Sequence, residues 1–437
     1  MRQQWLYSKL RILRTMGRLG SQYEKWSESL AARGRNEVIW IGSANVISAV
    51  SILGIAIMSA RQLGPSQRGE IVLVVAVAMI AAELASLGTN SVSRMEILSK
   101  GNVHIEDYLA MSLGLCVPLA VLMAFALTAF AKIGNQIDIG MVPEGVLLGV
   151  AMLLGNMLVD GCYAVRRPGA VGVREILIGV LPAIPVFVLW LDKQLTAERV
   201  VLLLAVGQLV GNFYMWREVR KVSKKLRFRL RAWLDVISRS IPIFITNISE
   251  RMAFRSDRLL VGILLSSSAL GIYSVAATAA EMPRILLIPA SKLVSNRIAA
   301  GEVGPDRILR LVARILVPYW LLLIVIIVIA PNLILQAVGK GYTGLRSPLM
   351  VMAVAEAILG IYLMAIAVLI GLKRYTRPQL SAGSGALVLI TATIVFAPTL
   401  GLIGMSVIRL TAFSAMAIVA LSLLTQEFQR SRPGDLK

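Results

Sequence analysis

Three arginines are spaced to lie on one face of a predicted apolar helix, residues 241–266. Arg251, Arg255 and Arg258 stand at i, i+4 and i+7, so their side chains stack over roughly 10 Å. A charge at the centre of a bilayer costs several kcal/mol, and such residues therefore face water or a partner. The guanidinium binds phosphate oxygens in pairs and stays ionised where water is scarce. The stripe predicts a wet cavity for a phosphate-bearing substrate.

Ion pairing is the alternative role of these arginines. Glu250 and Asp257 each precede an arginine by one residue, which places them about 100° around the helix from the stripe. Pairing therefore needs a carboxylate from another helix or a strained reach sideways. Arg284 and Glu281 are three residues apart and can pair with each other, whereas Arg409 stands alone in the last apolar segment.

Two sets of candidate site residues follow. The predicted substrate-binding set is Arg251, Arg255, Arg258, Arg284, Arg409, Asn45 and Asn247. The predicted coupling carboxylates are Glu83, Asp160, Asp257, Glu281 and Glu356. These carboxylates either counter the arginines or carry a coupling proton, because a buried carboxyl group takes up a proton more readily. Coupling to H⁺, to Na⁺ or to the membrane potential stays open.

The sequence offers no set of residues for a metal, a cofactor or a catalytic centre. Cys116 and Cys162 lie in or beside apolar runs, and the single histidine is His104. A zinc centre needs three or four clustered ligands, and two cysteines form no disulfide framework. We expect structural roles for all three residues.

The composition is that of a polytopic membrane protein. The 437 residues are 57% hydrophobic and 16% charged, with a mean hydropathy of +0.76, which excludes a soluble globular enzyme. Because one span takes about 20 apolar residues, the chain has room for roughly a dozen. The apolar runs predict all-α spans at 38–60, 71–92, 108–132, 145–165, 174–191, 199–216, 241–266, 271–296, 310–330, 346–372, 379–398 and 401–425.

These spans divide the chain into two halves. The predicted parts are a basic leader (1–37), a six-helix bundle (38–216), a basic linker (217–240), a second six-helix bundle (241–425) and a tail (426–437). The leader alternates basic residues with Trp5 and leucines, which indicates an amphipathic helix on anionic membrane lipid; a disordered tail is the alternative. The halves match at an offset of about 202 residues, as in Asn45 and Asn247 or Gly69 and Gly271.

Charge and span number fix the predicted topology. The formal charge is +21, and most Lys and Arg residues fall in alternate loops, together with the leader and the linker. The positive-inside rule then places both termini in the cytoplasm and makes a nucleic-acid partner unnecessary. Because six-span halves enter and leave on the same side, the repeats run parallel around a central cavity.

Four motifs carry a family resemblance that runs from Val38 to Thr425. They are LGP with Gly69 after the first span, LGTNSVSR at 87–94, SDRLLVGILLSSSALGIYSVA at 256–276 and GLIGMSVIRL at 401–410. The chain resembles the Wzx-type O-antigen and exopolysaccharide flippases of the multidrug/oligosaccharidyl-lipid/polysaccharide exporter superfamily.

The resemblance implies a function. The protein would move a polyisoprenyl-diphosphate-linked oligosaccharide from the inner to the outer leaflet of the bacterial cytoplasmic membrane by alternating access. Its partners would be the polysaccharide polymerase and glycosyltransferase machinery. Arg251 and Arg255 occupy the type of position at which related flippases are thought to meet the diphosphate.

Two other functions remain as alternatives. A cation-coupled drug exporter of the same superfamily would want an acidic cavity, and the first span has no carboxylate. A membrane-embedded polysaccharide polymerase or ligase would need a sizeable external loop, and the predicted external loops reach only about fifteen residues.

Overall fold

The computed structural model describes residues 2–99, 103–133, 137–138, 140–223, 225–299, 305–372, 374 and 377–430. Side chains are described from Trp40 onward, except at 133, 246, 305–306, 340, 397–398 and 430. The predicted amphipathic face of the leader and the last part of the predicted tail therefore lie outside the described residues.

The described chain is helical throughout, without a strand. Its elements are α1 (Arg2–Ser86), α2 (Thr89–Leu98), α3 (Ile105–Met111), a π-helical turn η1 (Ser112–Cys116), α4 (Val117–Ile133), α5 (Met141–Ala164), α6 (Gly169–Leu191), α7 (Ala197–Arg220), α8 (Leu230–Leu264), α9 (Ser267–Glu281), α10 (Arg284–Ala299), α11 (Pro305–Val338), a 3₁₀ turn η2 (Lys340–Leu345), α12 (Arg346–Gly371) and α13 (Arg377–Arg430).

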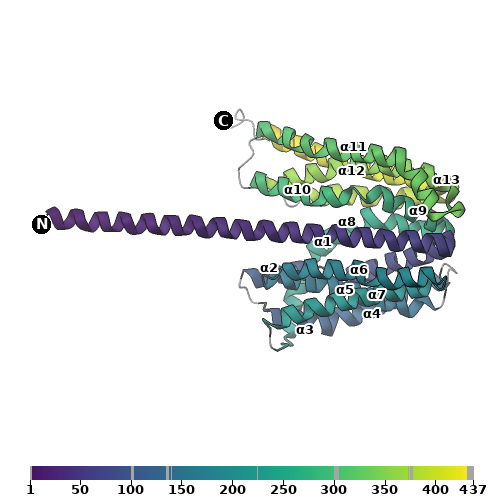
Figure 1. Ribbon diagram of the computed structural model, residues 1–437, viewed down its shortest axis with the longest axis horizontal. Coiled ribbons are helices and arrows are strands. Elements are labelled where there is room, and N and C mark those ends of the chain that lie inside the picture. The colour runs from purple at the N-terminus through teal and green to yellow at the C-terminus, as the bar shows by residue number, and fades with distance from the viewer. Residues whose placement is uncertain are drawn as a thin grey trace.

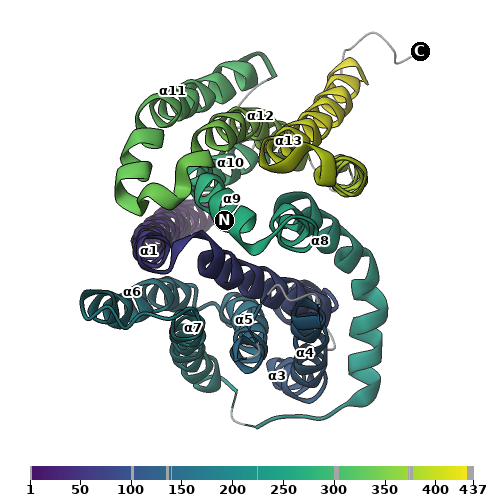
Figure 2. The ribbon, with the colours of Figure 1, turned by 90° about the vertical axis from the view of Figure 1, so that its right-hand side faces the viewer.

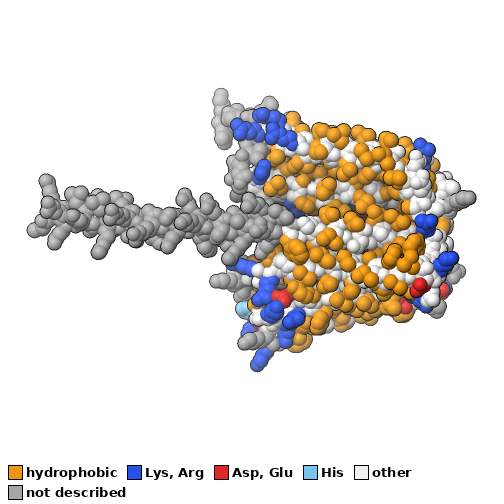
Figure 3. Space-filling model, viewed as in Figure 1, with side chains coloured by type: hydrophobic (Ala, Val, Ile, Leu, Met, Phe, Trp, Pro, Cys, Tyr) orange, Lys and Arg blue, Asp and Glu red, His pale blue; other side chains and the backbone are white. Residues whose placement is uncertain are grey.

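The protein is a multi-pass membrane protein by the length and composition of its helices. Among the described residues, nine helices are long and apolar enough to cross a membrane, or ten if the bent pair α9 and α10 is one span. Figure 3 shows hydrophobic side chains over the middle of one face and Lys and Arg side chains gathered at its two ends. Such a band is the surface that lipid covers.

The helices form two layers on either side of α1. In Figure 1, α2 to α7 lie below α1 and α9 to α13 lie above it, and the end-on view of Figure 2 shows the same division. We call the end where α7 finishes at Arg220 and α8 begins at Leu230 the linker end. The opposite end, where α1 bends at Gly64, is the far end.

Helix breaks differ from the predicted boundaries at three places. The predicted loop at 61–70 is much shorter than expected, because α1 bends at Gly64 (φ 76°) and restarts directly with Pro65, a residue suited to the first turn of a helix. The predicted linker 217–240 is shorter than expected, since α8 begins at Leu230. The predicted span 271–296 is bent by 44° between α9 and α10.

A reciprocal glycine contact joins the halves at the far end. A Cβ atom on Gly69 would lie 1.7 Å from the carbonyl oxygen of Ser267, and one on Gly271 would lie 1.9 Å from the carbonyl oxygen of Pro65. Both pairs of residues obey the predicted offset, since Pro65 corresponds to Ser267 and Gly69 to Gly271. Each half therefore contacts the other through equivalent positions, and only glycine permits this approach.

We expect Gly271→Ala to open this contact. The added methyl group meets backbone rather than a flexible side chain, and overpacking of this kind costs about 1–3 kcal/mol. The population of states with the far end open should rise roughly fivefold or more. Spin labels on the exposed residues Gln194 and Thr343, which flank the far end on the two halves, would report a longer distance by pulsed electron paramagnetic resonance.

Gly54→Ala is the matched control, because a Cβ atom at Gly54 meets nothing within 4 Å. If Gly271→Ala gave the same distance distribution as Gly54→Ala, the halves would not be held together by this contact.

Candidate functional site: an arginine-lined cavity between the halves

A cavity of about 630 Å³, here called the large cavity, lies between the two halves. Its lining comes from α1, α2, α5 and α6 on one side and from α8, α10 and α12 on the other. The lining residues are Glu83, Asn90, Asn156, Val159, Asp160, Arg174, Glu175, Asn247, Glu250, Arg251, Phe254, Arg255, Arg284, Ile288, Ser291, Leu359 and Leu363. Asn90, Asp160 and Ser291 place it towards the linker end.

The structure brings together about half of the site residues predicted from the sequence. The predicted residues that line the large cavity are Arg251, Arg255, Arg284, Asn247, Glu83 and Asp160. Arg258 lines a smaller neighbouring cavity instead. Asn45 and Arg409 are not in the lining of the large cavity, and Arg409 is only 1% exposed.

Carboxylates from other helices pair with the arginine stripe. Arg251 Nε lies 3.3 Å from Glu83 Oε2 of α1. Arg255 Nη1 donates to Glu281 Oε2 of α9 at 3.1 Å, and Arg258 Nη2 lies 2.9 Å from Glu281 Oε1. The alternative of ion pairing therefore has a partner for each arginine. The Arg251 side chain is nevertheless 46% exposed, so most of its donors remain available to a ligand in the cavity.

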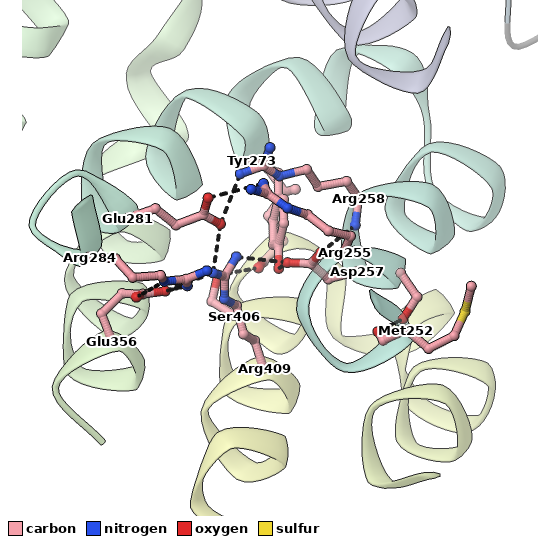
Figure 4. A network of polar contacts seen from close by, with 12 residues as sticks. Met252, Arg255, Asp257, Arg258, Tyr273, Glu281, Arg284, Glu356, Ser406 and Arg409 are labelled. Atoms are coloured by element: carbon pink, nitrogen blue, oxygen red, sulfur yellow. Dashed lines mark hydrogen bonds and ion pairs between the residues drawn. The ribbon is translucent and has the colours of Figure 1, made fainter. Parts of the chain in front are cut away.

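Behind the cavity lies a network of buried charges, shown in Figure 4. At its centre Arg409 of α13 donates to Asp257 Oδ2 at 2.8 Å, to Glu281 Oε1 at 2.7 Å and to Glu356 Oε1 at 2.8 Å. Arg284 Nε donates to Glu356 Oε2 at 2.9 Å, and its Nη2 donates to Oε1.

The network is anchored by further contacts at its edges. The Tyr273 hydroxyl donates to Asp257 Oδ2 at 2.8 Å. The Arg409 guanidinium carbon lies 5.1 Å from the ring centre of Phe413, and that of Arg284 lies 5.7 Å from the ring centre of Phe254. Such cation–π contacts favour the charged form of arginine where water is excluded.

The network carries a formal surplus of one positive charge. Its cations are Arg255, Arg258, Arg284 and Arg409, and its anions are Asp257, Glu281 and Glu356. Three predicted coupling carboxylates thus serve as partners of arginines within a single cluster. The half of the chain that follows the linker therefore presents a positive wall to the large cavity.

Sequence reasoning missed two charged residues of the first half, Arg174 and Glu175, which also line the large cavity. Arg174 of α6 is 7% exposed and donates to Glu175 at 2.7 Å and to Gln208 at 2.7 Å. The predicted span began at residue 174, which put this arginine at a membrane surface. The helix in fact begins at Gly169, so Arg174 lies more than one turn inside. Pro168, directly before this helix, is the signal that could have moved the boundary.

Three of the four carboxylates that line the large cavity are paired. Asp160 accepts hydrogen bonds from Arg94 at 2.6 Å and from Asn90 at 2.7 Å. Glu175 pairs with Arg174, and Glu83 pairs with Arg251. Pairing of this kind leaves little free negative charge to attract a cation.

No group of three His, Cys, Asp or Glu side chains in the described part of the chain could hold a metal ion. Cys116 and Cys162 are buried free thiols on different helices, where they pack in the core of the first half.

The chain belongs to the polysaccharide biosynthesis protein family, whose pattern it matches over residues 35–295. This match confirms the family resemblance read from the motifs. No curated protein matches the sequence.

Solved transporters share the fold. The lipid II flippase MurJ, in an inward closed conformation, is 13% identical with a TM-score of 0.72 over 89% of this chain and 87% of that one. An inward-facing multidrug resistance MATE family transporter of the MOP superfamily is 15% identical with a TM-score of 0.65 over 90% of this chain and 99% of that one. A Vibrio cholerae MATE transporter, VcmN, is 12% identical with a TM-score of 0.59, covering 91% and 97%.

We expect Arg409→Met to destabilise the protein strongly. The change leaves Asp257, Glu281 and Glu356 with one cation fewer in a buried site, and breaking a buried pair costs about 3–5 kcal/mol. The apparent melting temperature of the purified protein, followed by size-exclusion chromatography after heating, should fall on the order of 10 °C.

Arg239→Gln is the control for this measurement, because Arg239 is half exposed and pairs with the exposed Asp235. An exposed pair contributes about 0–1 kcal/mol. Equal melting temperatures for the two variants would mean that the buried network does not stabilise the fold.

Proposed function

We propose that this protein is a flippase for a lipid-linked oligosaccharide whose lipid and sugar are joined by a diphosphate. One observation carries the proposal: Arg251, paired by one carboxylate yet nearly half exposed, lines a large cavity between the halves of a membrane protein of the polysaccharide biosynthesis family. An arginine held in this way offers several donors to a phosphate group.

Twelve crossings in two parallel six-helix repeats fit the helices. The helix Trp40–Ser86 has 47 residues, or about 70 Å, which is twice the hydrocarbon thickness of about 30 Å, and its bend at Gly64 divides it into two crossings. α8 counts as a further crossing although its arginines make it less apolar. The bent pair α9 and α10 makes one more.

The orientation follows from the distribution of charge. Basic residues concentrate at the linker end, as in Arg227, Arg229 and Arg231, and the positive-inside rule assigns this end to the cytoplasm. The large cavity is displaced towards the linker end, whereas the glycine contact joins the halves at the far end. We infer a state prepared to load substrate from the cytoplasmic leaflet, from which rocking of the halves would release the substrate outside.

The roles of the arginines divide by exposure. Arg251, Arg255 and Arg284 reach the large cavity and would bind the diphosphate, with Asn247 beside them. Arg409 is enclosed by three carboxylates and would position α8, α9 and α12 rather than touch substrate. Glu83 would act as the counter-ion of Arg251 in the absence of substrate, because it is the partner that a phosphate would displace.

A cation-coupled drug exporter is the second candidate function. The observation that favours it is the presence of four carboxylates in the lining, of which Glu250 has no ion-pair partner among the described residues. The pairing of the other three weighs against a cationic substrate.

We expect Arg251→Ala to lower export of the surface polysaccharide roughly tenfold or more, since hydrogen bonds to charged groups contribute about 1.5–3 kcal/mol. The measurement compares polysaccharide export by cells that depend on the variant, normalised to folded protein in the membrane. Glu83→Gln removes the same ion pair but keeps the cation, and it should retain most of the export.

Export by Arg251→Ala equal to that by Glu83→Gln would contradict a phosphate-binding role, because loss of the ion pair alone would then account for the effect of Arg251→Ala.

The substrate class itself is tested by native mass spectrometry of the protein extracted gently from its own membrane. We expect a co-purifying polyprenyl-diphosphate glycan whose occupancy falls in Arg251→Ala. Finding ordinary phospholipids alone, together with saturable binding of organic cations, would replace the flippase by the drug exporter.

A further inference from the structure

A second cavity that contains arginines lies beyond the first. This arginine cavity has a volume of about 190 Å³ and is lined mainly by apolar side chains, together with Arg68, Arg255, Arg258 and Gln208. Arg255 lines both this cavity and the large cavity. Because α8 runs from the linker end to the far end, Arg258 lies two helical turns farther outward than Arg251.

Arg68 is a buried cation without a counter-ion. Arg68 is 9% exposed. Its Nη1 donates to the Ser59 hydroxyl at 3.3 Å, and its Nε has no hydrogen-bond partner. In the described part of the chain no carboxylate forms an ion pair with Arg68. A buried unpaired charge is strongly unfavourable. We therefore expect Arg68 to bind an anion from outside the protein.

The other two arginines of the cavity do not compensate for this surplus. Arg255 and Arg258 share a single carboxylate, Glu281, which also pairs with Arg409. The arginine cavity thus has three cations in its lining and no carboxylate of its own. Three arginines with so little compensating charge would be unfavourable in a closed apolar core. A phosphate with two negative charges would pair with them.

An apolar cavity adjoins the arginine cavity. It also measures about 190 Å³ and is enclosed by α1, α9 and α11, with Leu53, Ile57 and Ile334 in its lining. The two cavities share Ala56 and Thr278. A hydrocarbon chain in the apolar cavity would therefore continue directly into an anionic head group beside the arginines.

We propose that Arg68, with Arg255 and Arg258, forms a second phosphate site for a phosphate-linked lipid whose hydrocarbon lies in the apolar cavity. The inference deepens the proposed function and rests on it. The head group would pass from Arg251 to Arg255 and then to Arg258, each step about one helical turn along α8. Arg68 of α1 lines the same cavity as Arg258, so the charge of the head group is paired throughout its passage.

Photolabelling tests this site on the purified full-length protein. The probe is a farnesyl diphosphate analogue with a photoreactive group on its hydrocarbon, and labelled peptides are identified by mass spectrometry. We expect labelling at the apolar cavity, near Leu53, Thr278 and Ile334. Arg68→Gln should weaken it about tenfold, whereas Arg61→Gln, an exposed arginine of the same helix, should leave it unchanged.

Two further probes distinguish the source of the phosphate. The farnesol analogue, which lacks the diphosphate, should label the apolar cavity weakly and without dependence on Arg68. Inorganic pyrophosphate should raise the melting temperature less than farnesyl diphosphate does. Labelling by farnesol equal to that by the diphosphate, or equal stabilisation by pyrophosphate, would overturn a lipid-linked phosphate site.

If Arg68→Gln fails to fold, Arg258→Gln carries the same expectation. The outcome is separable from that of the proposed function. Labelling that depends on Arg68, combined with unimpaired export by Arg251→Ala, would uphold the second site and refute the role of Arg251. Loss of export in Arg251→Ala with labelling that ignores Arg68 would refute the second site alone.

Discussion

Compensation of buried charge is the constraint on which the second half of the molecule depends. Arg409 on α13 is almost completely buried and is bound by Asp257 of α8, Glu281 of α9 and Glu356 of α12. These ion pairs hold four helices together at one point, because moving any of them would leave an unpaired charge in an apolar interior. The arginines that reach the large cavity project from this fixed base, so their positions are set before a substrate arrives.

The contact between the halves is of a different kind. At the far end Gly69 and Gly271 bring backbone against backbone with no charge to separate. At the large cavity the halves are joined by the partly exposed ion pair of Arg251 with Glu83. A junction of small residues can part at low cost, whereas the network within the second half cannot. This difference favours movement of the halves as rigid bodies over rearrangement within them.

Local spacing predicted the stripe on α8 and its exposure to a cavity, because helical periodicity fixes which side chains share a face. It could not predict the partners, since Glu83 and Glu281 come from other helices and their approach is a property of tertiary packing. Arg68 was assigned to a loop because a polar run, 61–70, interrupts the apolar pattern. The helix instead restarts at Pro65 and carries Arg68 inward. Arg174 was missed because α6 begins at Gly169 and not at residue 174, where the predicted span begins.

The strength of pairing separates the arginines into a fully paired group and a weakly paired group. Arg409 has three close carboxylates and no access to a cavity, so a ligand would find no uncompensated charge there. Arg251 has one carboxylate partner, Glu83, at 3.3 Å, and Arg68 has a hydroxyl group alone. Both of these weakly paired arginines lie at the ends of the row of cations, one in the large cavity and one in the arginine cavity. An anion would therefore bind most strongly beside Arg251 and Arg68, where the protein supplies the fewest carboxylate partners. These two arginines lie at the two ends of its path, and Arg255 lies in the middle.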